Sequence, residues 1–249
     1  MIKIKVQDKE YDLINDWSEL TIQKFLEVQR ICDKAPEKLK KLIGHVYFGE
    51  KDEIEKMNFS NREQLKTFPK FYGDILLEMS DVPKEVVKTM DFESRVIHFN
   101  NHLIKFVIGC LFAPVDIPEI SNDSFKFEGE TFILPKSRNV LGNERPMGYI
   151  STIQFTESAD LDIYMRDLDD KNYGVLANII AILCLKEGEE YDEDVCLKRA
   201  EKFRNLTMDI AWDVFFYLDE LLNTYTKATL SSSLEKIKLN TQVSLGRQD

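Results

Sequence analysis

The chain has 249 residues, of which 43% are hydrophobic and 31% charged, a composition that favours a globular protein with a substantial core over a disordered one. Its 33 Lys and Arg face 44 Asp and Glu, and the net charge of -11 supplies no general attraction to phosphate backbones, so direct nucleic-acid binding is not expected. The apolar runs at 103–113 and 175–185 fall short of the ~20 residues of a membrane span, so no membrane partner is expected.

The N-terminal sequence MIKIKVQDKEYDL lacks the continuous apolar stretch of a secretory signal. The four cysteines contain no C-x-x-C pair, which favours reduced thiols over disulfides or a zinc site. Both features predict an intracellular protein. The cysteines are Cys32, Cys110, Cys184 and Cys196.

Residues 1–113 are expected to form a first half, a hairpin followed by helices. Ile2, Ile4 and Val6 alternate with polar residues before a polar turn at 7–10, which predicts a hairpin whose second strand starts at Tyr11. Helix-capping residues and apolar spacing predict the helices. These are expected from Thr21 to about Cys32, from Pro36 to Gly49, at 52–57, at 60–79 and at 91–113.

Pro114 and Pro118 predict a break, so 114–122 is interpreted as a linker to a second half at 123–230. This half is expected to open with a hairpin at 125–135 that turns at Glu128–Glu130. A polar loop at 136–146 follows. Helices are then predicted at 149–168, 173–185, 194–203 and 208–226. The expected fold is therefore mainly α with two short β-hairpins (α+β), as two helix-rich halves each opened by a hairpin; whether the halves are a duplication stays open.

The helix at 208–226 has the broadest apolar stripe, which is typical of a core face but also fits a partner groove. That stripe comprises Ile210, Ala211, Val214, Phe215, Leu218, Leu221, Leu222 and Tyr225. The tail at 231–249 is expected to be mobile unless a partner orders it, through the weakly amphipathic stretch 234–239. The predicted partner-interface residues are Trp17, Phe25, Phe215, Leu218, Leu222, Tyr225, Leu234 and Ile237.

No nucleophile-elbow, phosphate-loop or dinucleotide-binding motif is present, so no catalytic or cofactor-binding residue and no cofactor is predicted. His98 and His102 have the i, i+4 spacing of two metal ligands, but without the glutamate of an H-E-x-x-H motif they are interpreted as a structural or partly exposed pair. Aspartates at 160, 162, 167, 169 and 170 flank a helix end. They are interpreted as a solvated face rather than as an acid/base set.

The stretch LKEGEEYDEDVC, at 185–196, places six carboxylates in eight consecutive positions and ends at Cys196. It lacks the ligand order of a calcium loop. The favoured interpretation is a joint between two helices: Gly188 would end one helix in a left-handed conformation, and Asp192 would cap the next. The helix start would lower the pKa of the Cys196 thiol, whereas the neighbouring carboxylates would oppose thiolate formation.

Five ordered elements are spread over residues 1–225. They are DWSELTIQKFLE at 16–27, IEKMNF at 54–59, FEGETFIL at 127–134, GEEYD at 188–192, and RAEKF at 199–203 with LTMD at 206–209. In this order they resemble uncharacterised virion and tail-assembly proteins of tailed bacteriophages. The second hairpin departs from the family pattern, because residues 137–146 separate it from the next helix.

The resemblance implies a non-enzymatic bacteriophage structural or assembly protein of the neck, tail or capsid interior, which acts through protein–protein contacts. Its partners would be other virion proteins or copies of itself in a ring or oligomer. Two alternatives stay open: a tail-assembly chaperone absent from the mature virion, and a small phage-encoded enzyme with an unrecognised site. The expected location is the host cytoplasm during assembly and then the virion.

Overall fold

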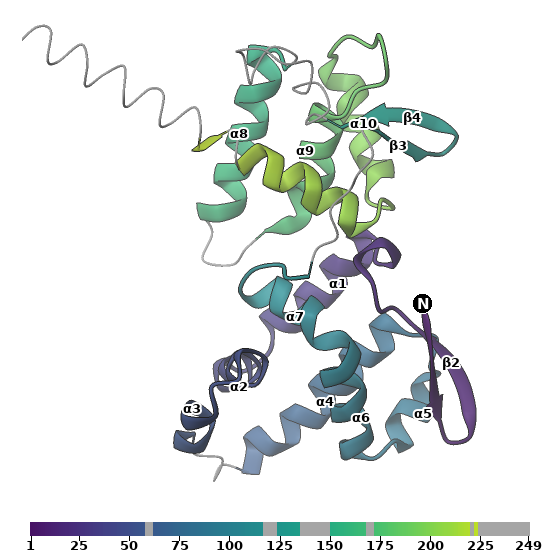
Figure 1. The fold of residues 1–249 in the computed structure, drawn as a ribbon, viewed down its shortest axis with the longest axis vertical. Coiled ribbons are helices and arrows are strands. Elements are labelled where there is room, and N and C mark those ends of the chain that lie inside the picture. Colours follow the sequence, from purple (N-terminus) through teal and green to yellow (C-terminus); the bar gives the residue numbers. More distant parts are fainter. Residues whose placement is uncertain (58–61, 117–123, 135–149, 168–171, 220–221, 224–249) are drawn as a thin grey trace, which may run out of the picture.

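The computed structural model describes residues 1–57, 62–116, 124–134, 150–167, 172–219 and 222–223. Its helices are accompanied by two separate two-stranded antiparallel sheets, so the predicted mainly α fold with two hairpins is confirmed. Figure 1 shows the second half stacked on the first along the longest axis, with α1 (Ile22–Asp33) at the junction. In the described part of the chain, no helix combines the length and apolarity needed to cross a bilayer.

The first hairpin pairs β1 (Ile2–Val6) with β2 (Lys9–Leu13), Ile2 opposite Leu13. The turn consists only of Gln7 and Asp8, both left-handed with φ of 50° and 64°. A two-residue turn with positive φ at both positions matches the twist of the strands it joins. The second strand therefore starts at Lys9 rather than at the predicted Tyr11, because the turn is two residues long instead of four.

Helices predicted in the first half are found with small shifts in their ends. They are α1, α2 (Glu37–Phe48), α3 (Lys51–Lys56) and α4 (Arg62–Met79). Thr21 caps α1 by accepting a hydrogen bond from the backbone N–H of Lys24, and Gly49 ends α2 in a left-handed conformation with φ of 72°. A further short helix, α5 (Lys84–Thr89), was not predicted.

The single helix predicted at 91–113 has three parts: α6 (Phe92–His98), the π-helical turn η2 (Phe99–Leu103) and α7 (Ile104–Leu111). The backbone N–H of Ile104 donates to the carbonyl of Phe99, five residues earlier, as π geometry requires. This extra residue rotates α7 relative to α6, a change that an unbroken 3.6-residue period does not predict.

The second half contains β3 (Ser124–Phe127), β4 (Glu130–Ile133), α8 (Thr152–Asp167), the 3-10 turn η4 (Tyr173–Val175), α9 (Leu176–Leu183), α10 (Glu193–Phe203) and a helix at 208–219. The second hairpin turns at Glu128 and Gly129, with φ of 51° and 81°. Three predicted segments lie outside the described residues: most of the linker, the whole loop at 136–146 and the whole tail at 231–249.

Within the described residues, three backbone hydrogen bonds connect the two halves. The N–H groups of Ile22 and Gln23, at the start of α1, donate to the carbonyls of Leu206 and Arg204 at 2.8 Å each. In return, the N–H of Met208 donates to the carbonyl of Leu20 at 2.7 Å. The unpaired N–H groups at the starts of two helices are thereby used to join the halves.

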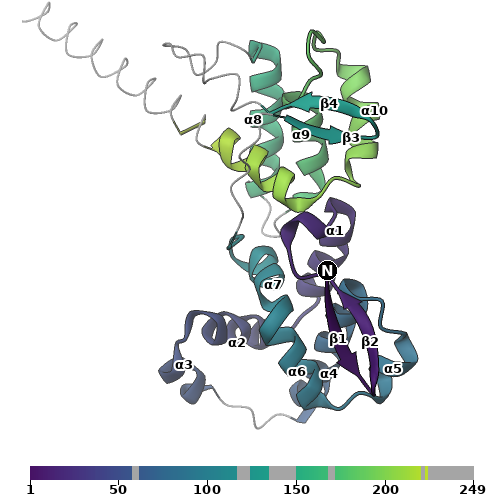
Figure 2. The same ribbon diagram turned by 45° about the vertical axis from the view of Figure 1, so that its right-hand side comes forward.

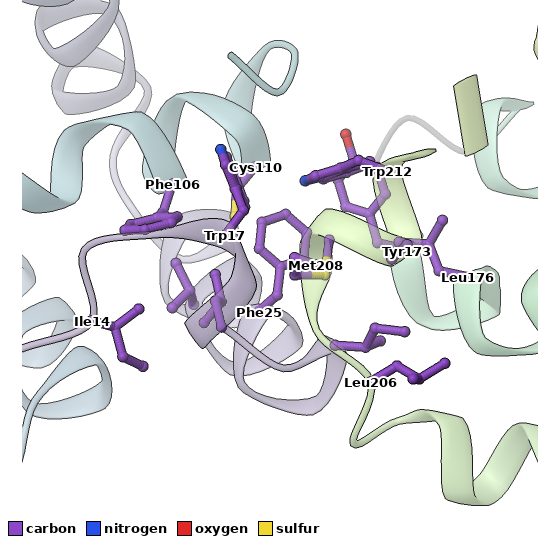
Figure 3. Close-up of a cluster of buried hydrophobic side chains, with 14 of the residues drawn as sticks. Ile14, Trp17, Phe25, Phe106, Cys110, Tyr173, Leu176, Leu206, Met208 and Trp212 are labelled. Carbon is purple, nitrogen blue, oxygen red and sulfur yellow. The ribbon is translucent and has the colours of Figure 1, made fainter. Parts of the chain in front are cut away.

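A cluster of aromatic rings fills the junction, where Trp17 and Phe106 of the first half face Tyr173 and Trp212 of the second (Figure 3). Ring centroids lie 4.7 Å apart for Trp17 and Phe106, 6.0 Å for Trp17 and Trp212, and 5.3 Å for Tyr173 and Trp212. The Oη–H of Tyr173 donates to the carbonyl of Gly109 at 3.3 Å. The halves thus share one buried core, while their division at 114–122 stays a prediction.

Candidate interaction surfaces

The acidic stretch at 185–196 first extends the second hairpin. Lys186 forms a bridge with Phe132 of β4, and the N–H of Ile133 donates to the carbonyl of Leu185 at 3.0 Å. This pairing requires an extended backbone, so α9 ends at Leu183 rather than at the predicted Leu185. Gly188 is left-handed, with φ of 74°, but it lies in the turn after this bridge and does not end the helix as predicted.

The predicted start of the next helix is confirmed at Asp192, whose side chain accepts a hydrogen bond from the N–H of Val195 at 2.9 Å. Glu193 and Asp194 lie in the first turn of α10, where the positive end of the helix dipole favours carboxylates. At least three of the six carboxylates therefore have a structural position at a helix start.

A further carboxylate in this stretch, Glu189, holds a buried arginine. Its Oε1 pairs with Arg199 of α10, whose side chain is only 7% exposed, and its Oε2 accepts the N–H of Lys186 at 2.9 Å. The guanidinium lies 5.1 Å from the ring centroid of Phe132, a cation–π arrangement. Arg199 thus joins the acidic stretch, α10 and the hairpin into one unit.

A groove of 260 Å³ opens beside this unit, between α8 and α10 with α9 at its floor. Leu161, Ile182 and Leu197 supply apolar surface, and Leu197 is 52% exposed. The rest of its lining consists of Glu157, Asp160, Asn178, Tyr191, Glu193 and Cys196. An apolar groove with carboxylates on both flanking helices is suited to a ligand that is itself apolar and positively charged.

The titratable groups of this groove are not arranged as a nucleophile and base. Burial raises the pKa of the Cys196 thiol, although the Arg199 charge and the backbone bond to Asp192 oppose the shift. Burial, and then a hydrogen bond donated to Glu157, raise the pKa of Tyr191 far above its ordinary value. Both groups therefore stay protonated at neutral pH, which makes the thiol a poor nucleophile.

Asp160 and Asp162 of α8 do not share one solvated face as predicted. Asp160 is exposed and lines the groove, whereas Asp162 is buried. Asp169 and Asp170 lie outside the described residues. The divergence of Asp160 and Asp162 follows from the turn of the helix, which directs residues two positions apart to different faces.

His98 directly precedes the π-helical turn and His102 lies within it, and the two form a half-buried pair with ring centroids 6.4 Å apart. Burial lowers the pKa of both, and the charge of His102 adds to the effect on His98. Among the residues that the structure describes, no group of three or more His, Cys, Asp or Glu side chains could hold a metal ion.

The predicted partner-interface residues divide into three groups. Trp17, Phe25 and Leu218 are fully buried, which corrects the prediction for them: they pack inside the chain and have no surface to offer a partner. Phe215 and Leu222 are half-buried. Tyr225, Leu234 and Ile237 lie outside the described residues.

The helix at 208–219 buries a stripe that matches the predicted one in part, since Ala211, Val214 and Leu218 belong to both. Met208, Ala211, Trp212, Val214 and Leu218 are buried, whereas Ile210 is only half-buried. Trp212 was absent from the predicted stripe, although its size alone favours burial. The face is rotated because the helix must meet both the rings of the first half and those of its own half.

Three exposed phenylalanines form an aromatic surface that crosses both halves: Phe48, Phe112 and Phe216, which are 56%, 41% and 42% exposed. The rings of Phe48 and Phe112 lie 6.1 Å apart. Phe112 and Phe216 line a second groove, of 450 Å³, together with Ala113, Pro114, Met165, Tyr173, Phe215 and Asp219. Exposed apolar surface of this kind marks sites of protein association.

Sequence reasoning missed this aromatic surface. Phe48 ends the amphipathic helix α2 and Phe112 directly follows the apolar helix α7, where an aromatic residue is typical of a core position. Phe216 did carry a signal, since it lies outside the predicted apolar stripe of its helix.

A scan against protein-family models found no match, and searches of curated proteins and of solved structures found none either.

Proposed function

We propose that this protein is a non-enzymatic bacteriophage structural or assembly protein that acts through protein–protein contacts. The phage context rests on the order of the five sequence elements between residues 16 and 209. The contact role rests chiefly on the aromatic surface, because three phenylalanines that are each 41% exposed or more lie next to one another across both halves, and clustered exposed apolar side chains mark sites of protein association.

The chemistry of the described grooves is consistent with this role. The smaller groove has a protonated thiol and tyrosine beside carboxylates, and the larger one has Asp219 as its single charged residue. Catalytic sites instead bring together an activated nucleophile or a base with groups that stabilise the developing charge.

Mass spectrometry of purified particles tests the phage assignment. The protein is expected among the virion components at a fixed ratio to the others. Its absence from particles, combined with its recovery in a soluble complex with a virion protein, would favour the assembly-chaperone form. Absence from both would overturn the proposal.

Two single variants, Phe48→Glu and Phe216→Glu, test the contact role separately from the phage assignment. Both substitutions place charge on the aromatic surface without opening the core, so association with copies or virion partners is expected to weaken at least about tenfold. Ile97→Glu is the matched control, since Ile97 is 48% exposed but belongs to α6. Equal association by all three variants, measured by sedimentation and light scattering, would exclude this surface.

A further inference from the structure

The last 26 residues, 224–249, differ in charge from the rest of this acidic chain. Their net charge is +2, from four cations against two carboxylates, whereas the whole chain carries -11. The charged residues are Lys227, Lys236, Lys238, Arg247, Glu235 and Asp249. An asymmetry of this kind is a sequence signal for an electrostatic interaction with an acidic surface.

The same stretch carries apolar residues at helical spacing. Leu230, Leu234 and Ile237 follow an i, i+4, i+7 pattern, and Lys236 and Lys238 flank Ile237. This is the pattern of a basic amphipathic segment, the kind of ligand that binds an apolar groove by its stripe and the rim by its charges.

The groove between α8 and α10 has the complementary character. Leu161, Ile182 and Leu197 supply its apolar surface, and carboxylates stand on both flanking helices. Asp160 of α8 and Glu193 of α10 are exposed, and neither is ion-paired within the part of the chain that the structure describes. The larger groove lacks this acidic rim, with Asp219 as its single carboxylate.

The described chain near its C-terminal side also lies within reach of the acidic groove. Asp219 and Met165 of α8 line the same cavity, so the helix that begins at 208 lies beside α8 at residue 219. Asp160 precedes Met165 by five residues, about 7.5 Å along the helix axis. The ten residues 224–233 span up to about 33 Å when extended, which exceeds this separation several-fold.

We propose that the segment 224–249 binds in the acidic groove of its own chain, with Leu234 and Ile237 over the apolar floor and Lys236 and Lys238 at the carboxylates of Asp160 and Glu193. The own-chain segment is favoured over a separate partner because it carries the complementary charge and is tethered nearby, which gives it a high effective concentration.

Limited trypsin digestion of the full chain tests this proposal, with the C-terminal fragments followed by mass spectrometry. A bound segment protects the bonds after Lys236 and Lys238. The variant Asp160→Asn/Glu193→Gln removes both proposed ion pairs without adding a trypsin site, so cleavage there is expected to be about tenfold faster. High salt should speed cleavage of the wild-type chain in the same way.

The matched control is Asp194→Asn/Glu10→Gln, which changes the charge equally. Asp194 lies in the same turn of α10 but outside the groove lining, and Glu10 lies on β2. Equal cleavage rates in wild type, groove variant and control would overturn the proposal. Protection that rises with protein concentration would instead assign the segment to the groove of a second copy, and so overturn binding within one chain. Particle composition does not enter this readout, so the phage assignment and this proposal can fail separately.

Discussion

The hairpins of the two halves pack against the rest of the fold in the same way, but the arginine of each half has different hydrogen-bond and ion-pair partners. In each half, the second strand also pairs with the chain just beyond a helix: Leu13 bridges Ser80 after α4, and Phe132 bridges Lys186 after α9. Figure 2 shows β1 and β2 beside α4 and α5, and β3 and β4 beside α9 and α10. A hairpin of two strands is marginal alone, so this third segment and a helical face complete it.

The difference between the halves is clearest in their arginines. Arg95 of the first half donates to four carbonyls, those of Pro69, Val87, Lys88 and Met90, at 2.6–3.3 Å. Arg199 of the second half pairs with one carboxylate and lies over one ring. The first half therefore uses a cation to satisfy backbone carbonyls around α5, whereas the second uses it to hold the acidic stretch.

The largest expected effect is at the junction that joins the halves. Trp17→Ala removes a fully buried ring and the hydrogen bond from its Nε1–H to the Val115 carbonyl, at 2.9 Å. The expected loss of unfolding free energy is about 3–5 kcal/mol. Urea denaturation measures it, and Phe92→Ala, which truncates a ring that is 47% exposed, is the control. A loss below about 1 kcal/mol would show that the halves do not depend on this core.

Replacing each arginine by lysine tests the contrast between the halves. Lysine cannot reach four carbonyls with one ammonium, so Arg95→Lys is expected to cost about 2 kcal/mol. Arg199→Lys keeps a cation beside Glu189 and is expected to cost about half as much. Thermal unfolding of both variants under one condition shows which substitution costs more stability. A larger loss for Arg199→Lys than for Arg95→Lys would contradict this account of the two sites.

Two tyrosines, one in each half, are expected to lower the stability of the chain at alkaline pH. Burial raises the pKa of Tyr72 to about 12, and burial together with Glu157 raises that of Tyr191 further. The folded chain keeps these protons where the unfolded chain loses them, so unfolding free energy should fall as pH rises from about 10 through 12.

Phenylalanine variants at both positions should flatten this fall in stability. Tyr191→Phe also removes the hydrogen bond donated to Glu157, so it should lower stability at neutral pH, whereas Tyr72→Phe should change it by less than about 0.5 kcal/mol. Melting temperatures at several pH values measure both effects. An unchanged alkaline slope in both variants would rule out these tyrosines as its source.

The smallest effects are expected at the two hairpin turns. Gly129→Ala forces a side chain into φ of 81° and should cost about 1 kcal/mol. Asp8→Gly relieves φ of 64° but loses the exposed ion pair with Lys5, so a net gain of about 0.5 kcal/mol is expected. Both are measured by thermal unfolding, and a stabilising Gly129→Ala would mean that the turn changes conformation.

Local signals in the sequence were enough to predict the mainly α fold, both hairpins and most helix starts. Thr21 and Asp192 cap helices because a short oxygen-bearing side chain reaches the N–H groups of the next turn, and Gly49 ends one because glycine adopts positive φ freely. These interactions act over a few residues, so they are readable from the sequence alone.

Only the tertiary structure decided which apolar residues are buried and which form surfaces. Trp17 and Trp212 are 195 positions apart, and their burial depends on how two halves meet, whereas Phe48, Phe112 and Phe216 have the same chemistry and stay exposed. Likewise, the acidic stretch at 185–196 was readable as a helix joint, but its pairing with β4 and its place beside the groove were not. Burial is set by partners distant in the chain, and periodicity within one helix does not contain that information.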